Sequence, residues 1–216
     1  PIPDPQVMSL FSGVEALGIE SDDESEIGTL GVPEMGTFIV RDMIRDAKPK
    51  TYDNIIQLSG LSHGTGVWAG NAQDLIKNGS CTIDNVIGCR DGIMTTLLSY
   101  NLPKKDAFAI MERVRKGRGM TEEQEQLMLS CGVPDWYIES CRKIQYMFPR
   151  AHAVAYTISA LRIAWFKVYY PEEYYAAAFT IRGSFDSSYM LADQTAIERR
   201  MAALSADGKL RLSPTD

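Results

Sequence analysis

The sequence lacks the features of several protein classes. It has only two histidines, and none of its four cysteines forms a C-x-x-C pair, so no zinc-site spacing is present. No apolar run reaches the ~20 residues of a membrane span. Residue 1 begins PIPDPQ, without the basic and apolar regions of a signal peptide. We therefore expect a cytoplasmic protein with no membrane contact, no metal site and reduced, mostly buried thiols.

Strand patterns are also missing. No segment alternates apolar and polar residues at a period of two, and no internal repeat is visible. Instead, apolar residues recur at spacings of three and four in segments that begin with a proline, namely Pro5, Pro33, Pro103, Pro134, Pro149 and Pro171. The sequence therefore predicts an all-α fold with at most a minor hairpin, in a chain long enough to bury a real core.

Basic residues are absent from the first thirty positions. Residues 1–30 contain seven acidic side chains, whereas the remaining chain has a net charge of +1, although the whole sequence carries −6. This asymmetry suggests an acidic leader attached to a body that can face nucleic acid. We divide the chain into an acidic leader or connection over residues 1–30, a helical domain over 31–204, and a tail over 205–216 that is typical of a frayed or artificial end.

The central helical segment is predicted over residues 151–170, which contain no Gly, Pro, Asn or Asp. Four apolar side chains at helical spacing predict its core-facing stripe, namely Ile158, Leu161, Trp165 and Val168. Between Ser140 and Tyr170 there are five Lys or Arg residues and no Asp or Glu. A span of that composition is well suited to contact a phosphate.

The first turn of this helix is predicted to be an anion site. Pro149 suits the first helical position, and Phe148 offers no side chain to cap the free N–H groups. These groups lie beside Arg150 and His152, and Tyr156 follows one turn later on the same face. The alternative is that Arg150 pairs with a surface carboxylate and His152 packs in the core.

A glycine-rich stretch, SGLSHGTGVW at residues 59–68, predicts a tight loop between helices. It lacks the GK[ST] ending of a P-loop, which excludes nucleotide binding by that route. The pattern resembles helix-hairpin-helix loops that offer backbone N–H groups to DNA phosphates, but it also fits a plain connecting turn. If it contacts DNA or a nucleotide, Gly64→Val should impair binding and leave the melting temperature close to unchanged.

A second basic cluster follows the helix that Pro103 opens. Residues 104–118 contain six basic and two acidic side chains and end in RVRKGRG. These cations either complement the helix dipole or bind phosphates. Arg90 stands at the positive end of another predicted helix, over residues 89–100. There it either binds an anion or pairs with its neighbour Asp91.

Several segments together resemble a known family. MFPRAHAVAYTISALRIAWFKVYYP resembles the F-[NP]-[KR]-x-H-x-x-x-Y region of C-family bacterial replicative DNA polymerases. TLGVPEMGT, LSGLSHGT, VIGCRDG and RVRKGRG precede it in the order found in Gram-positive-type (PolC class) DNA polymerase III alpha subunits. The resemblance covers roughly residues 1–200 and implies the α-helical fingers that follow the palm. Gly66 and Gly92 depart from it, because aspartate is expected at both positions.

The resemblance implies that the chain binds the incoming dNTP and the primer-template terminus of a bacterial DNA-directed DNA polymerase. The implied dNTP-binding residues are Arg150, His152, Tyr156, Arg113, Arg115, Lys116 and Arg118. The implied template or base-pocket residues are Ser59, Ser62, His63, Gly64, Phe148 and Arg90.

In that family the catalytic aspartates and their Mg²⁺ belong to the palm, and no D-x-D motif of that kind occurs here, so the chain alone is expected to be inactive. Further implied partners are the remaining polymerase domains and other replisome subunits. An independent helical DNA-binding module and a helical protein-interaction scaffold are the alternatives.

Overall fold

The structure is a computed structural model that describes residues 3–20, 26–181 and 192–206. Over these ranges it contains helices and no β-strand, and Thr65 and Tyr146 form an isolated antiparallel bridge. In the same ranges, no helix has the length and apolar character needed to cross a membrane. The all-α prediction is confirmed. Residues 21–25 of the predicted acidic leader, residues 182–191 and most of the predicted tail, residues 207–216, lie outside the described residues.

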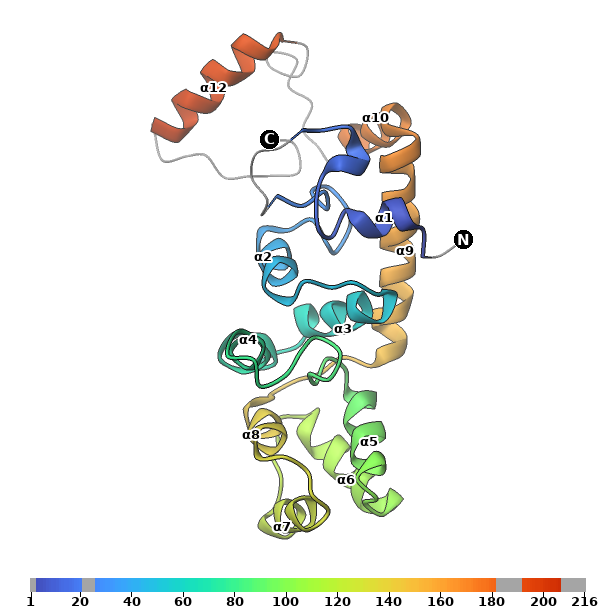
Figure 1. The fold of residues 1–216 in the computed structure, drawn as a ribbon, viewed down its shortest axis with the longest axis vertical. Helices are drawn as coiled ribbons and strands as arrows, with labels where there is room; N and C mark the ends of the chain where they lie inside the picture. Colours follow the sequence, from blue (N-terminus) through green and yellow to red (C-terminus); the bar gives the residue numbers. More distant parts are fainter. Residues whose placement is uncertain (1–2, 21–25, 182–191, 207–216) are drawn as a thin grey trace.

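The helices form an elongated body, in which α9 runs parallel to the long axis beside α1, α2 and α3, and α5 to α8 lie beyond its lower end (Figure 1). They are α1 (Pro5–Ser9), the 3-10 helix η1 (Glu15–Leu17), α2 (Phe38–Ala47), α3 (Tyr52–His63), the π-type turn η2 (Trp68–Ala72), α4 (Gln73–Lys77), α5 (Arg90–Ser99), α6 (Lys104–Val114), α7 (Glu122–Ser130), α8 (Asp135–Lys143), α9 (Arg150–Tyr169), α10 (Pro171–Ile181) and α12 (Gln194–Ala206).

Side-chain caps set several helix starts. The hydroxyl of Thr121 accepts from the backbone N–H of Gln124, whose side chain accepts from the N–H of Thr121, so the two residues form a capping box at the start of α7. The helix predicted to begin at Pro33 instead begins at Phe38, because the Thr37 hydroxyl caps it. Residues 30–36 form turns before that cap.

Helix α9 confirms the predicted long helix but buries a different face. Of the four residues expected to face the core, Leu161 is buried and the other three are half-buried. The buried face is instead built of small side chains, with a lysine at one end: Ala153, Thr157, Ala160, Leu161, Ala164 and Lys167. Alanines let neighbouring backbones approach closely, and α9 packs against α1, α3, α5 and α10.

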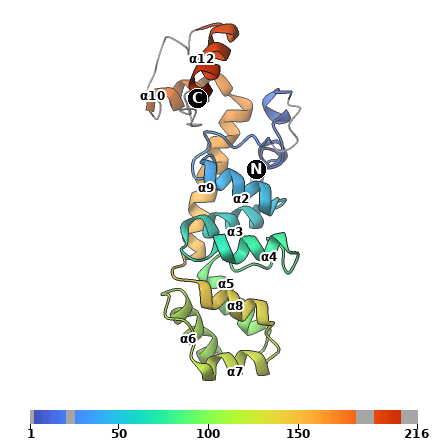
Figure 2. The same cartoon turned by 90° about the vertical axis from the view of Figure 1, so that its left-hand side faces the viewer.

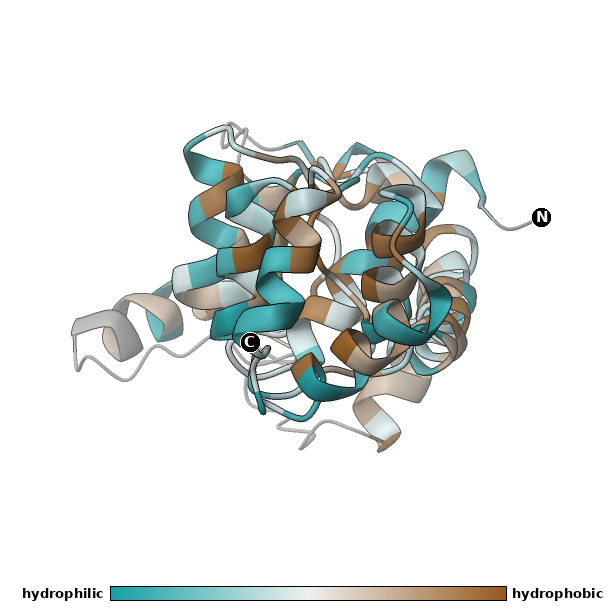
Figure 3. Cartoon of the chain, turned by 90° about the horizontal axis from the view of Figure 1, so that it is seen from below, coloured by the Kyte–Doolittle hydropathy of each residue, from teal (hydrophilic) through white to brown (hydrophobic). Residues whose placement is uncertain are grey.

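The N terminus of α9 lies where two parts of the body meet. In Figures 1 and 2 it stands at the level of α3, next to the group formed by α5, α6, α7 and α8. Figure 3 shows hydrophilic and hydrophobic residues alternating along individual helices, as expected for helices with one buried face. Residues from α3, α5 and α9 therefore approach one another at this level.

The cysteines agree with the expected reduced state. All four are free thiols, and Cys81, Cys89 and Cys141 are buried whereas Cys131 is half-buried. Burial raises the pKa of Cys89 to about 11. A thiol that stays protonated at neutral pH is a poor nucleophile, so Cys89 acts as a small apolar side chain in the core.

Candidate functional site

A row of aromatic rings lies at the start of α9. We call Tyr146, Phe148, His152 and Tyr156 the aromatic ladder. Successive ring centroids along it are 5.3, 4.7 and 4.3 Å apart. The structure thus brings three predicted site residues, Phe148, His152 and Tyr156, into one surface, on which the Tyr156 side chain is exposed.

The ladder combines two kinds of regular spacing. His152 and Tyr156 are one helical turn apart in α9 and so share a face. Tyr146 and Phe148 lie two residues apart in the non-helical segment between α8 and α9, and their rings meet edge to face. The sequence reasoning missed Tyr146. Its position two residues before Phe148 was the signal that could have identified it.

His63 joins the ladder from α3. Its ring centroid lies 5.4 Å from that of Phe148, 5.7 Å from that of His152 and 6.4 Å from that of Tyr156. Contacts at hydrogen-bond distance fix the His63 ring at Nδ1, which lies 2.7 Å from Ser59 O and 2.9 Å from Ser62 Oγ. The Ser62 hydroxyl itself donates to Ser59 O, so the end of α3 fixes His63 through its own last turn.

The predicted loop over residues 59–68 is only partly a loop. Helix α3 continues through Ser59 and Gly60 to His63, and Gly64 is its C-cap. The reason is packing, because a Cβ on Gly60 would meet Gly88 O at 2.2 Å, so glycine lets the helix pass close to that backbone. Ser59 is buried in the same turn, and its hydroxyl finds no partner in the described part of the chain.

The true loop, residues 64–67, is anchored to the backbone that carries the ladder. Thr65 N donates to Tyr146 O at 2.9 Å, and Gln145 N donates to Thr65 O at 2.9 Å. A Cβ on Gly64 would lie 2.8 Å from Tyr146 O, and one on Gly66 would lie 2.2 Å from Lys143 O. Gly66 also has φ +69°, so an aspartate at this position requires a different local backbone.

Gly64→Val is therefore expected to destabilise the fold, by about 1–3 kcal/mol, because its branched side chain overpacks Val67 and the Tyr146 carbonyl. This corrects the expectation from sequence that the melting temperature stays close to unchanged. Thermal unfolding followed by circular dichroism measures the effect. An unchanged melting temperature would contradict the close packing of this loop against residues 145–147.

The N terminus of α9 is not open to an external anion in the way the sequence predicts. Pro149 offers no side-chain cap, but Asp91 of α5 accepts from the Arg150 backbone N–H at 2.6 Å through Oδ2. The Arg150 guanidinium forms an ion pair with Asp53 of α3, and its side chain is 39% exposed. Asp53 and Asp91 lie outside the span between Ser140 and Tyr170, which contains no Asp or Glu. Their carboxylates occupy the positions that the sequence predicted for a phosphate.

Arg90 lies at the same junction. Its backbone N–H donates to Phe148 O at 3.1 Å, which ties α5 to the segment that carries the ladder. The nearest atoms of its guanidinium and the Asp91 carboxylate, Nε and Oδ2, are 3.8 Å apart. Asp91 Oδ2 therefore faces both the Arg90 guanidinium and the Arg150 backbone N–H at the start of α9.

The basic cluster after α6 is largely satisfied by the chain itself. Arg115 Nη2 and Lys116 Nζ each lie 2.9 Å from Glu112 Oε2, and hydrogen bonds from Arg115 and then Lys116 lower the pKa of Glu112 to about 2. Arg113 donates to the backbone carbonyls of Gly119 and Arg118 at 3.1 and 3.2 Å. The exposed Arg118 side chain makes no ion pair within the described ranges.

Backbone contacts place this basic cluster next to residues 145–147, which lead into the ladder. Met147 N donates to Arg115 O at 3.3 Å, and Gly117, at φ +68°, passes so close to Gln145 that a Cβ would lie 2.5 Å from its carbonyl oxygen. The turn that holds the basic side chains is thus packed against residues 145–147. The described residues contain no group of three or more His, Cys, Asp or Glu side chains that could hold a metal.

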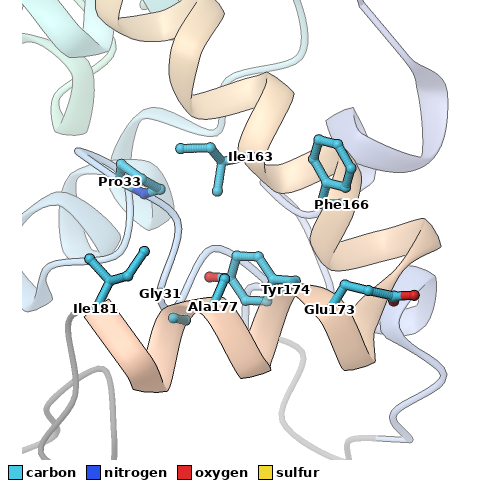
Figure 4. A pocket seen from close by; sticks show the side chains of 9 residues that line it. Gly31, Pro33, Ile163, Phe166, Glu173, Tyr174, Ala177 and Ile181 are labelled. Atoms are coloured by element: carbon cyan, nitrogen blue, oxygen red, sulfur yellow. The ribbon is translucent and has the colours of Figure 1, made fainter.

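Two hollows lie away from these residues. One, of about 380 Å³, is formed by α9, α10 and the segment around Gly31, with a mainly apolar lining that includes Ile163, Phe166 and Tyr174 (Figure 4). The other, of about 430 Å³, is lined by residues of α2, by residues 48–50, by Phe11 and Ser12 after α1, and by Ile27. Neither of these two hollows is lined by a predicted site residue.

Comparison with known proteins agrees with the resemblance seen in the sequence. The family model described as "Bacterial DNA polymerase III alpha subunit finger domain" matches residues 1–131. The "DNA polymerase III PolC-type" of Pediococcus pentosaceus is 53% identical over 210 residues, covering 96% of this chain and 15% of the relative. The Bacillus subtilis protein of the same description is 52% identical over 218 residues, covering 100% and 15%.

The protein of that description from Staphylococcus epidermidis is 54% identical over 199 residues, covering 91% of this chain and 14% of the relative. The chain thus spans about one-seventh of the length of the curated relatives it matches. The family model covers more than half of the chain, and the relatives extend the likeness through the ladder and α9. The chain therefore belongs to the finger-domain family of bacterial DNA polymerase III alpha subunits.

Proposed function

We propose that this chain is the fingers segment of a bacterial replicative DNA polymerase and that the aromatic ladder and Arg150 bind the incoming dNTP. One observation carries the proposal: Phe148, His152 and Tyr156 form a continuous row of rings with His63 from α3, at the same helix start that carries Arg150. The relatives named as DNA polymerases support the activity of the longer protein.

The rings and the cations would act on different parts of the nucleotide. Aromatic faces stack on bases of any sequence, each stack being worth about 1–3 kcal/mol, so Tyr156 and His152 suit the base or the sugar. Arg150 would exchange its exposed contact with Asp53 for the more highly charged triphosphate. Lys116 and Arg118 would add positive charge from the turn beside residues 145–147, as would Arg113 and Arg115 if the triphosphate competes for their present partners.

The template side would be formed by the end of α3 and the start of α5. Ser62, His63 and Gly64 lie where the helix ends, and Arg90 lies across from them against Phe148. Ser59 would support these residues from the core, because it is buried. In this arrangement the templating base and the incoming base would meet at the ladder, with primer-template DNA as the second ligand.

The described residues offer no group of three or more His, Cys, Asp or Glu side chains that could hold Mg²⁺. In the proposed polymerase, carboxylates from other domains would hold Mg²⁺, and this chain alone would be inactive. Residues 31–204 would form the fingers and residues 1–30 the connection to the palm. The remaining domains and other replisome subunits would be its protein partners, in the cytoplasm.

Arg150→Ala in the full-length polymerase should raise the KM for dNTP at least about tenfold, because a charge-assisted contact is worth about 1.5–3 kcal/mol and 1.4 kcal/mol is one decade. The melting temperature should stay nearly constant, since an exposed ion pair contributes about 0–1 kcal/mol. Steady-state kinetics against dNTP concentration give the KM, and the affinity for primer-template is measured in parallel.

Asp53→Asn is the matched control. It removes the same ion pair but keeps the arginine, so its KM for dNTP should equal or fall below that of the unmodified enzyme. If Arg150→Ala weakened primer-template binding and left the KM for dNTP unchanged, Arg150 would contact the DNA duplex and not the nucleotide. If Arg150→Ala changed neither quantity, the proposed dNTP site would be wrong.

A further inference from the structure

The turns before α2 bring a carboxylate to the aromatic ladder. Glu34 Oε2 lies 3.1 Å from His63 Nε2, and the two side chains are 35% and 22% exposed. On the opposite edge of the ring, Nδ1 lies 2.7 Å from Ser59 O. Both ring nitrogens therefore face acceptor oxygens, one from α3 itself and one from a segment 29 residues earlier in the sequence.

The backbone around Glu34 is unusual for a residue with a side chain. Glu34 has φ +65°, in the left-handed region that glycine and asparagine favour. The turn is rigid, because Val32 and Met35 are buried and a Cβ on Gly36 would lie 2.7 Å from Gly31 N. A glycine would adopt this conformation more easily, so the turn alone does not account for a glutamate at this position.

The contact that the Glu34 side chain makes explains why a glutamate stands in this turn. From this left-handed turn the carboxylate reaches across to the end of α3 and meets His63, whose ring contacts three members of the ladder. Acceptors on the ring nitrogens of a histidine fix the orientation of its ring, and here Ser59 O and Glu34 Oε2 supply one acceptor each, which leaves the ring itself to meet the ladder. Glu34 has the geometry of such an acceptor.

We propose that Glu34 is a positioning residue for the nucleotide site: it holds the His63 ring against the aromatic ladder in the orientation that receives the dNTP. This inference rests on the proposed function and deepens it, because it assigns a role to a residue outside the predicted site. Glu34 acts through His63 and makes no contact with the nucleotide itself.

The test uses the full-length polymerase and three variants. Glu34→Ala should raise the KM for dNTP about fivefold with little change in kcat, as expected when a hydrogen bond of ordinary strength is lost from a binding site. Glu34→Gln keeps an acceptor oxygen and should restore the KM to within about twofold of the unmodified enzyme. Glu34→Gly should show the same KM as Glu34→Ala but a higher melting temperature, because glycine suits φ +65°.

A double-mutant cycle with His63 decides whether Glu34 acts through that ring. His63→Ala should raise the KM for dNTP, and Glu34→Ala should add nothing in the His63→Ala background. A full further increase in that background would overturn the inference, because Glu34 would then act independently of His63. A KM that follows the melting temperature across the alanine and glycine variants would overturn it as well, by showing a purely structural role.

The cycle also separates this inference from the proposed function. If His63→Ala and Arg150→Ala raise the KM for dNTP while Glu34→Ala does not, the nucleotide site stands and the role of Glu34 is wrong. If none of the three changes affects the KM for dNTP, the proposed nucleotide site fails, and the inference about Glu34 fails with it.

Discussion

Gly60→Ala is expected to lower the free energy of unfolding by about 3 kcal/mol, at the upper end of what overpacking costs. An added Cβ would lie 2.2 Å from Gly88 O and 2.5 Å from Cys89 Sγ. The first atom belongs to the backbone and the second to a buried side chain, so neither can move aside cheaply. Helix α3 would have to shift away from residues 88–89, which lead directly into α5.

Gly92→Ala is the matched control for this change. Gly92 is also helical, in the first turn of α5, but a Cβ there would meet nothing within 4 Å. The substitution should therefore raise the stability by up to ~1 kcal/mol, the difference in helix propensity between the two residues. Urea unfolding of both variants measures the contrast. Equal effects would show that helix propensity, and not the approach of α3 to residues 88–89, determines the response at Gly60.

Lys167 should give the fold a stability that rises with pH. Its side chain is 3% exposed, and Nζ donates to Gly28 O at 2.8 Å and Leu30 O at 2.7 Å. Burial, and secondarily the nearby Arg41, lowers the pKa of Lys167 from 10.5 to about 8. The folded state thus releases this proton at a lower pH than the unfolded state, and a neutral amine still has two N–H groups for the two carbonyls.

Between pH 8 and 10.5 the unfolded chain therefore binds more protons at this site than the folded chain, so rising pH favours folding. Below pH 8 both states are protonated and above 10.5 both are neutral, so the site adds no pH dependence there. The free energy of unfolding of the unmodified protein, minus that of Lys167→Met, should increase by about 3 kcal/mol across this window, at 1.36 kcal/mol per pKa unit.

Taking the difference between the two proteins cancels the titration of groups that they share. Chemical denaturation at a series of pH values from 7 to 11 provides the data. A difference that stays constant over this range would mean that the two carbonyl contacts keep the Lys167 amine charged in the folded state, against the effect of burial.

Local sequence determined much of the site. The recurrence of apolar residues at spacings of three and four predicted the helices, because helical periodicity depends only on neighbours within one or two turns. The spacing of His152 and Tyr156 likewise placed both rings on one face of α9, and Thr121 with Gln124 fixed a helix start. In each case the residues that make the contact are close together in the chain.

Only the tertiary structure decided which groups face these rings and cations. The span around Arg150 contains no acidic residue, yet the fold brings Asp53, Asp91 and Glu34 to its edge from α3, α5 and the turns before α2. Periodicity likewise could not reveal that Gly60 is helical or that Lys167 is buried. The face of a helix is set by its own residues, whereas its partners, and so the local dielectric and charge, depend on how distant segments pack.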